Sequence, residues 1–168
     1  MVNPLFSKSK PVVQEEDLSS TEDLPYWRVL IVDDEPEVHN VTVLALKNFK
    51  VLGRYIEYSH AYSANEAMEL LDENDDFAVA FVDVVMETDH AGLELVDYIR
   101  NTLNNSKVRL VLRTGQPGQA PEQSVVEKYD INDYREKTEL TSNKLKTVLF
   151  SALRSFRDIN TIDEQRLG

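Results

Sequence analysis

Acidic residues directly follow two apolar runs of the sequence. Asp33, Asp34 and Glu35 come after RVLIV, residues 28–32, and Asp83 lies inside the stretch FVDVVM. A carboxylate in an apolar run is costly to bury unless it is paired or binds a cation. Asp83 therefore either marks the end of a strand or has a chemical role.

A hydroxyl and an amine follow two later runs. Thr114 lies near the end of KVRLVLRTG, and Lys137 comes directly after INDYRE. Each polar residue has an ordinary structural explanation when taken alone, because carboxylates after strands cap helices and surface Thr and Lys side chains are solvated. The residues acquire a joint meaning if all of the runs are strands that end at one edge of a sheet.

Together these side chains are suited to phosphoryl transfer. Clustered carboxylates repel one another, and a hard cation that prefers oxygen ligands, Mg²⁺ or Mn²⁺, holds such a cluster. The cation screens Asp83, so that its carboxylate can attack an anionic phosphorus and form an aspartyl phosphate. Lys137 can bind one phosphoryl oxygen as a point charge, and Thr114 can donate a hydrogen bond to another.

The elements that would position these residues follow from the hydrophobic pattern, in which strand-like runs alternate with helical periodicity. The run 77–84 is apolar on both faces, which is typical of a central parallel strand. Residues 63–73 read as a helix with Ser63 as N-cap and Glu66 completing a capping box. The predicted strands are 28–32, 54–62, 77–84, 107–115 and 131–136. The predicted helices are 36–50, with Val38, Val41, Ala45 and Phe49 at helical spacing, 63–73, 91–103, 119–129 and a long helix from about Leu140.

Alternation of strands and helices with short connections predicts an α/β fold with a doubly wound five-stranded parallel sheet. Ligands of such sheets bind at the carboxyl ends of the strands. Because all the candidate residues follow strands, they are expected to converge along this edge.

Composition limits the class of protein. The chain has 168 residues, 42% of them hydrophobic, and a net charge of −12, which disfavours nucleic-acid binding by this chain. It has no cysteine, no apolar run long enough to span a membrane and no signal-peptide pattern, so we expect a cytoplasmic protein. Residues 1–26 lack any periodicity and are expected to form a mobile leader, and 159–168 a linker or helix extension.

Residues 27–158, about four-fifths of the chain, resemble the receiver domain of two-component response regulators. The resemblance is carried by four motifs in order: VLIVDDEP, FVDVVM, LRTG and YREK. It implies a (βα)₅ flavodoxin-like fold. It also implies transfer of a phosphoryl group to Asp83 from the phosphohistidine of a sensor histidine kinase or histidine phosphotransfer protein. Such a protein is a phosphoacceptor with self-catalysed transfer and autodephosphorylation rather than a conventional enzyme.

The resemblance also assigns a role to each site residue. Asp34 and Asp83 would ligate Mg²⁺, with the backbone carbonyl of Val85 as a third protein ligand and Asp33 acting through metal-bound water. A second group of residues responds to the phosphoryl group. Thr114 and Lys137 would hold that group, and Tyr134 matches an aromatic switch, with a half-exposed strand tyrosine as the structural alternative.

The sequence departs from the family pattern in three places. Glu87 and Thr138 stand where the family usually has proline, so the usual cis peptide before Thr138 is doubtful. The stretch between Asp83 and Gly92 is about one residue longer than usual, which predicts a loop of its own shape. Residues 115–123 are rich in Gly and Pro and are expected to form a mobile loop.

The response is expected to pass through the face made by 119–129, 131–136 and the last helix, either to a homodimer or to an output domain beyond this chain. VLRTGQPGQAPE and ALRSFRDI resemble receivers attached to cyclic-di-nucleotide signalling modules. Two alternatives stay open. A haloacid-dehalogenase-like phosphatase uses similar residues but needs an acid where Val85 stands, and a degenerate receiver would act as a binding module only.

Overall fold

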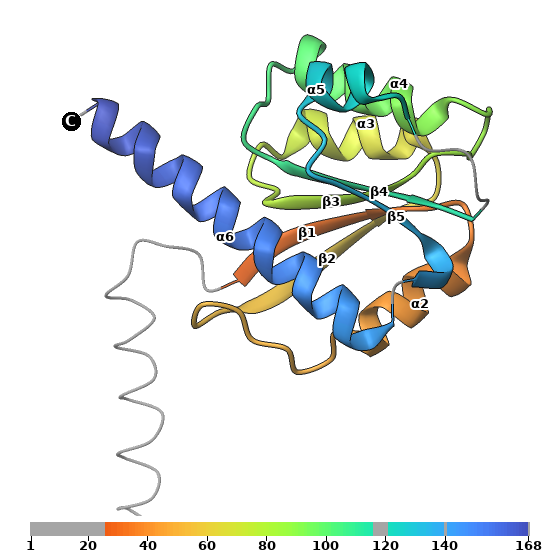
Figure 1. The fold of residues 1–168 in the computed structure, drawn as a ribbon, viewed down its shortest axis with the longest axis horizontal. Helices are drawn as coiled ribbons and strands as arrows, with labels where there is room; N and C mark the ends of the chain where they lie inside the picture. The colour runs from red at the N-terminus through yellow and green to blue at the C-terminus, as the bar shows by residue number, and fades with distance from the viewer. Residues whose placement is uncertain (1–25, 116–120, 140, 168) are drawn as a thin grey trace, which may run out of the picture.

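A computed structural model of the chain describes residues 26–115, 121–139 and 141–167. Five parallel strands form one sheet in the order β2-β1-β3-β4-β5 (Figure 1), which confirms the predicted fold class. The order reverses between β1 and β3, the arrangement that leaves a crevice at the carboxyl ends of these strands. The strands are β1 Tyr26–Val32, β2 Tyr55–Ala61, β3 Val79–Asp83, β4 Arg109–Thr114 and β5 Asp133–Glu136.

Helices cover both faces of the sheet (Figure 1). Helix α2, Pro36–Ala45, and helix α6, Ser142–Leu167, cover one face. Three helices cover the other: α3 Ala64–Glu73, α4 Ala91–Asp97, which continues as the π-helical turn η1 Tyr98–Thr102, and α5 Gln123–Tyr129. A short 3₁₀ turn, η2 Lys137–Glu139, links β5 to α6.

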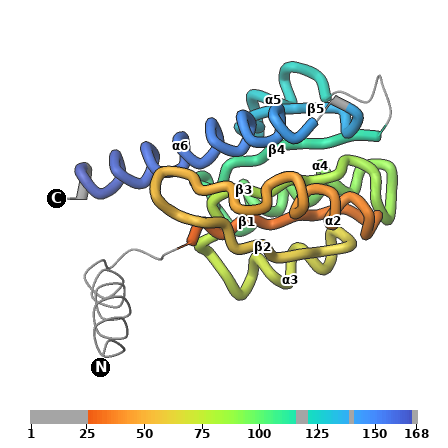
Figure 2. The backbone as a smooth tube through the Cα atoms, turned by 90° about the horizontal axis from the view of Figure 1, so that it is seen from below, coloured from red at the N-terminus to blue at the C-terminus, as the bar shows by residue number. Residues whose placement is uncertain are grey.

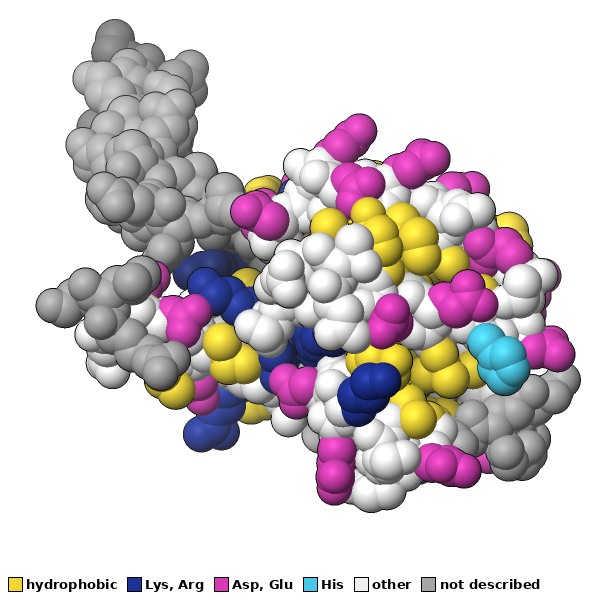
Figure 3. All heavy atoms as spheres, turned by 90° about the horizontal axis from the view of Figure 1, so that it is seen from above, with side chains coloured by type: hydrophobic (Ala, Val, Ile, Leu, Met, Phe, Trp, Pro, Cys, Tyr) yellow, Lys and Arg dark blue, Asp and Glu magenta, His cyan; other side chains and the backbone are white. Residues whose placement is uncertain are grey.

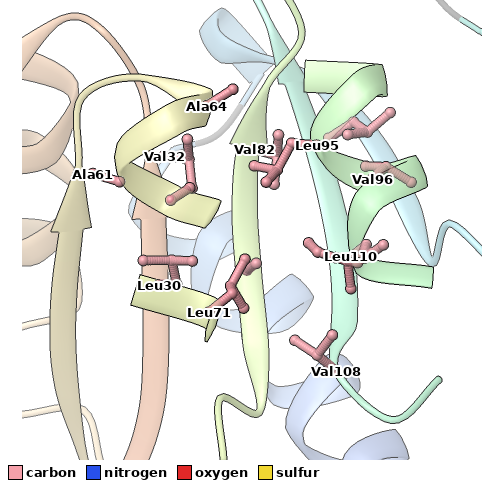
Figure 4. Close-up of a cluster of buried hydrophobic side chains, with 14 of the residues drawn as sticks. Leu30, Val32, Ala61, Ala64, Leu71, Val82, Leu95, Val96, Val108 and Leu110 are labelled. Carbon is pink, nitrogen blue, oxygen red and sulfur yellow. The ribbon is translucent and has the colours of Figure 1, made fainter. Parts of the chain in front are cut away.

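Two hydrophobic cores hold these layers together. Along β1, Leu30 and Val32 face α3 and α4, whereas Val29 and Ile31 face α2 and α6. Complete burial on both faces explains why the central strands read as continuous apolar runs. Each fully buried aliphatic side chain contributes about 2 kcal/mol to folding. Figure 4 shows the α3–α4 side of this arrangement, with side chains from the strands meeting those of the helices.

Helix α2 differs from its prediction. It ends at Ala45, and Asn48 has a φ of 62°, which places it in the left-handed region. Val41, one of the residues whose spacing predicted the helix, is 64% exposed, while the polar His39 and Thr42 are buried against the sheet. The inward face of α2 therefore includes polar residues, which meet polar groups near the ends of β1 and β4.

Helix α6 is 26 residues long, about 39 Å at the usual helical rise, and its last part projects past the sheet (Figure 2). Residues 159–167 are helical and continue α6. The predicted leader at 1–26 lies outside the described residues except for Tyr26, which begins β1. The loop predicted at 115–123 is described only in part, and α5 begins at Gln123 rather than at 119.

Candidate functional site

The candidate residues do gather at one edge of the sheet. Val32 of β1 pairs with Val82 of β3, so that Asp33, which follows β1, and Asp83, the last residue of β3, lie at the same level. Asp33 is fully buried and Asp83 is 4% exposed. Two carboxylates thus occupy neighbouring positions at the edge where this type of fold binds ligands.

Lys137 joins these carboxylates. Its Nζ lies 3.0 Å from Asp33 Oδ2, 3.0 Å from Glu35 Oε1 and 3.3 Å from Asp83 Oδ2. The lysine starts beyond β5 and reaches the ends of β3 and β1, so it crosses the sheet edge. Burial lowers the pKa of Lys137, but hydrogen bonds and charge from the acids outweigh this effect and raise its pKa overall. The ammonium is therefore charged at every physiological pH.

The turn after β1 presents three carboxylates together. Oxygens of Asp33, Asp34 and Glu35 lie within 4.8 Å of one another. The Asp33 carboxylate is held in place, since its Oδ1 accepts a hydrogen bond of 2.9 Å from the Glu35 backbone N–H. Asp34 is exposed, so its carboxylate is accessible from solvent. An all-oxygen donor set of this charge fits a hard divalent cation.

The environment of Asp83 tunes its ionisation. Burial raises the pKa of Asp83 to about 6, the negative charges of Asp33 and Asp34 act in the same direction, and Lys137 opposes them. The carboxylate is thus mostly ionised at neutral pH but poorly solvated. A desolvated carboxylate beside a lysine is suited to nucleophilic attack on an anionic centre.

Gly92 holds the loop after Asp83 against helix α4. Its backbone N–H donates to the Val84 carbonyl at 2.9 Å. A Cβ at this position would lie 2.7 Å from the Val84 Cα and would overlap the Asp83 carbonyl oxygen. The backbone around Asp83 therefore requires glycine here because no side chain fits.

Glu87 stands where the family usually has proline, and its carboxylate binds the start of helix α3. Its Oε1 accepts a hydrogen bond of 2.9 Å from Ala64 N–H, and its Oε2 accepts one of 3.2 Å from Asn65 N–H. Ser63 Oγ accepts from Glu66 N–H at 3.0 Å, as predicted for an N-cap. The first three N–H groups of α3 are therefore all satisfied, and Glu87 ties the loop after Asp83 to this helix.

The structure also answers two questions of local geometry, the capping box of α3 and the peptide bond before Thr138. The Glu66 carboxylate accepts from Tyr62 N–H at 3.0 Å, so the reciprocal bond of the predicted capping box goes to the residue before the cap. Among the described residues no peptide bond is cis, which includes the bond before Thr138.

The other candidate residues lie on the opposite face of the sheet edge. Thr114 is buried at the end of β4, and Tyr134 of β5 pairs with Leu112, so both project toward α3, α4 and α5. Tyr134 is half-buried and its hydroxyl is shielded from solvent. Val85 is also half-buried and packs against the same core. Thr114 and Tyr134 thus lie on the same face of two neighbouring strands, β4 and β5.

Two features of the site were not predicted from the sequence. Glu35 contacts Lys137, and Arg113 of β4 is buried beside the acids with 3% exposure. The signal for Arg113 was present in the run LVLRT, where a charged residue interrupts an apolar strand just as Asp83 does.

The chain is acidic overall. Figure 3 looks onto the molecule from the side of α4 and α5, where acidic side chains are spread over the face. The net charge of the chain is −12, and like charges repel a phosphate backbone. No helix in the described part of the chain has the length and apolarity needed to cross a bilayer.

Comparison with known proteins is consistent with this geometry. Residues 29–149 match the family of response regulator receiver domains. A curated relative, 3'3'-cGAMP-specific phosphodiesterase 2 of Vibrio cholerae serotype O1 (strain ATCC 39315 / El Tor Inaba N16961), is 55% identical over 142 residues. This match covers 84% of the present chain and 27% of that protein, so the chain spans about a quarter of the relative's length.

Solved structures share the fold. The signal receiver domain of an HD domain-containing protein from Pseudomonas fluorescens Pf-5 is 16% identical with a TM-score of 0.66, over 84% of this chain and 96% of that one. The receiver domain of NtrX from Brucella abortus is 21% identical with a TM-score of 0.62, over 75% and 98% of the two chains. The match to a receiver leaves the phosphatase alternative without support. With its five-stranded parallel sheet and its acidic strand ends, the chain belongs to the response regulator receiver domains of two-component signalling.

Proposed function

We propose that this receiver accepts a phosphoryl group on Asp83 from the phosphohistidine of a sensor histidine kinase or phosphotransfer protein. The observation that carries the proposal is the contact of Lys137 with both Asp33 and Asp83 at the sheet edge. The Lys137 ammonium already lies where a phosphoryl group on Asp83 would add negative charge. The action is expected in the cytoplasm, where such kinases present their phosphohistidine.

Mg²⁺ is the cofactor that the donor set fits best. Asp34 and Asp83 would hold the ion, with the Val85 carbonyl as a further ligand and Asp33 acting through a bound water. When bound, the ion neutralises charge on the phosphoryl oxygens and on the acids around them. Asp34 is exposed and is not among the acids that Lys137 contacts, so it is free to take a cation.

The transfer itself conserves charge and atoms. A carboxylate oxygen of Asp83 attacks the phosphorus and forms the P–O bond while the P–N bond to the donor histidine breaks. The histidine nitrogen keeps the bonding electrons and is reprotonated from solvent. Lys137 pairs with one phosphoryl oxygen, and the Thr114 hydroxyl donates a hydrogen bond to another. Later attack of water on phosphorus breaks the P–O bond to Asp83, releases inorganic phosphate and returns Asp83 to its free carboxylate form.

The direct test is the mass of the protein after incubation with acetyl phosphate and Mg²⁺. The wild type should gain one phosphoryl group, and Asp83→Asn should gain none. Asp34→Asn should lose most of its Mg²⁺ affinity, measured by calorimetry because Trp27 lies at the opposite end of β1. Phosphorylation of Asp83→Asn to the wild-type level would overturn the assignment.

The response is proposed to reach an output domain through α5, β5 and α6. Thr114 and Lys137 both connect to these elements, and a ligand shifts a conformational equilibrium only through contacts that differ between two states. Helix α6 projects past the sheet and can carry the change onward (Figure 2). Similarity to a 3'3'-cGAMP-specific phosphodiesterase makes cyclic-dinucleotide signalling the output we favour.

Hydrogen exchange with and without beryllofluoride, a phosphoryl mimic, tests this route. Protection should change across 123–158, and a homodimer through the same face would appear as a larger sedimentation coefficient. Changes restricted to 36–50 would contradict the proposed face.

A further inference from the structure

Arg113 is a buried arginine near the end of β4. It is 3% exposed, and Nη1 donates a hydrogen bond of 2.9 Å to Thr42 Oγ1. Its Cζ lies 4.9 Å from the centroid of the Phe81 ring. Nε and Nη2 are buried and have no hydrogen-bond partner among the described residues. Such a poorly satisfied buried cation is costly and calls for a compensating negative charge.

The strand register shows where that charge lies. Arg113 pairs directly with Asp83, and Val84 N–H donates to the Arg113 carbonyl at 3.1 Å. Paired residues of adjacent strands project to the same face of a sheet. Since Asp33 lies level with Asp83, the two acids and the arginine form one row on the face covered by α2 and α6.

The electrostatics of Arg113 agree with this row. Burial lowers the pKa of Arg113 to about 10, while the charges of Asp33 and then Asp83 act to raise it. The guanidinium is still a cation at neutral pH. At neutral pH the interaction is therefore one between opposite charges in a poorly solvated layer, where Coulomb forces are strong.

A purely structural role, or a role in binding a dissolved anion, fits Arg113 less well. Arg109, on the same strand and also 3% exposed, shows how a structural arginine is satisfied: it pairs with Asp130 at 3.3 Å and donates to the Lys107 and Ser106 carbonyls. Arg113 has no such set. A hollow of about 200 Å³ between α2 and α6 borders Arg113, but its Nε and Nη2 are shielded from solvent, so a dissolved anion does not reach them.

We propose that Arg113 is a positioning residue of the phosphoacceptor site, a second and immobile cation that balances Asp33 and Asp83. It favours the added negative charge of a phosphoryl group on Asp83 and opposes binding of a divalent cation. Lys137 can turn toward the phosphoryl group, whereas Arg113 is held by Thr42 and Phe81 and keeps its charge in place. This inference rests on the proposed function.

The test exploits the opposite signs of these two effects. In Arg113→Met, Mg²⁺ should bind about tenfold more tightly by calorimetry, because a nearby positive charge is gone. At saturating Mg²⁺, beryllofluoride should bind about tenfold more weakly. Arg113→Lys should stay near wild type in both. Arg109→Met removes an equally buried arginine from the same strand. It should not produce the combination of tighter Mg²⁺ binding and weaker beryllofluoride binding.

Arg113→Gln, which keeps a donor for Thr42, is a second neutral variant should Arg113→Met not fold. If the folded neutral variants lost affinity for both Mg²⁺ and beryllofluoride, Arg113 would act only through packing, and the inference would be overturned. Unchanged affinities would overturn it as well. A wild type that binds neither Mg²⁺ nor beryllofluoride would instead overturn the proposed function, and this inference with it.

Discussion

The backbone of Gly92 lies so close to Asp83 that a single methyl group would overlap the Asp83 carbonyl oxygen. Gly92→Ala is therefore expected to lower the free energy of unfolding by about 1–3 kcal/mol and to slow phosphorylation, because the Asp83 loop must shift. Urea denaturation and intact mass after acetyl phosphate treatment measure these effects. Gly115→Ala is the matched control, since its Cβ would meet nothing closer than Lys137 Cδ at 3.9 Å. Equal behaviour of the two variants would contradict this role of Gly92.

Lys137 is expected to stabilise the unphosphorylated domain because it neutralises Asp33 and Asp83. Lys137→Met should lower the free energy of unfolding by roughly 1–3 kcal/mol, since two buried carboxylates lose their shared partner. Adding Asp33→Asn should restore part of this loss, because the remaining carboxylate then has less repulsion. Chemical denaturation of the single and double variants forms the cycle. Strict additivity of the two substitutions would show that the pair is not coupled.

Glu87 is expected to anchor the loop after Asp83 through helix α3. Glu87→Ala should cost about 1 kcal/mol of unfolding free energy, the usual value for a lost helix cap. Burial by itself raises the pKa of Glu87, but backbone N–H groups of Ala64, Glu87 and Asn65 lower it overall from 4.5. The cap therefore stabilises the folded state fully above pH 4.5. This stabilisation is lost as pH falls through the lowered pKa of Glu87.

Glu69→Ala is the control for this cap, because Glu69 is an exposed acid of the same helix. The difference between Glu87→Ala and wild type should shrink as pH falls through the lowered pKa of Glu87, whereas Glu69→Ala should show little difference across the same range. A difference for Glu87→Ala that is constant down to pH 3 would argue against a cap by the ionised carboxylate.

How far the sequence predicts this site depends on the kind of contact. Asp33, Asp83 and Lys137 were predictable, because strand ends in a parallel sheet share one edge whatever the details of packing. The cap by Glu87 was not, since it joins segments 23 residues apart through a loop whose shape has no periodic signal.

Helix α2 shows a second limit. The apolar spacing of 36–50 indicated a helix but not its orientation, and Val41 faces solvent. Thr42 faces inward because Arg113 needs an acceptor, and His39 does so because its Nε2 lies 2.7 Å from the Asp33 carbonyl oxygen. Polar pairings between distant elements override a hydrophobic pattern, and a single sequence does not display them.

Asp83 is expected to reduce the stability of the metal-free domain at neutral pH. Its pKa is raised from 3.8 to about 6 in the folded state, so folded chains bind more protons than unfolded ones between these values. The free energy of unfolding therefore falls as pH rises through this window. Above it, Asp83→Asn should be more stable than wild type by roughly 2–3 kcal/mol, and below pH 4 the two should converge.

Urea denaturation from pH 3.5 to 8 in the presence of a chelator measures this difference. Asp75→Asn, an exposed acid in the loop between α3 and β3, is the control and should show no comparable pH dependence. Adding Mg²⁺ at pH 7.5 should stabilise the wild type far more than Asp83→Asn, since the ion binds only the ionised acid cluster. If Asp83→Asn were less stable than wild type above pH 6, or equally stable at every pH, burial and the neighbouring acids would not destabilise the ionised Asp83 carboxylate in the folded state.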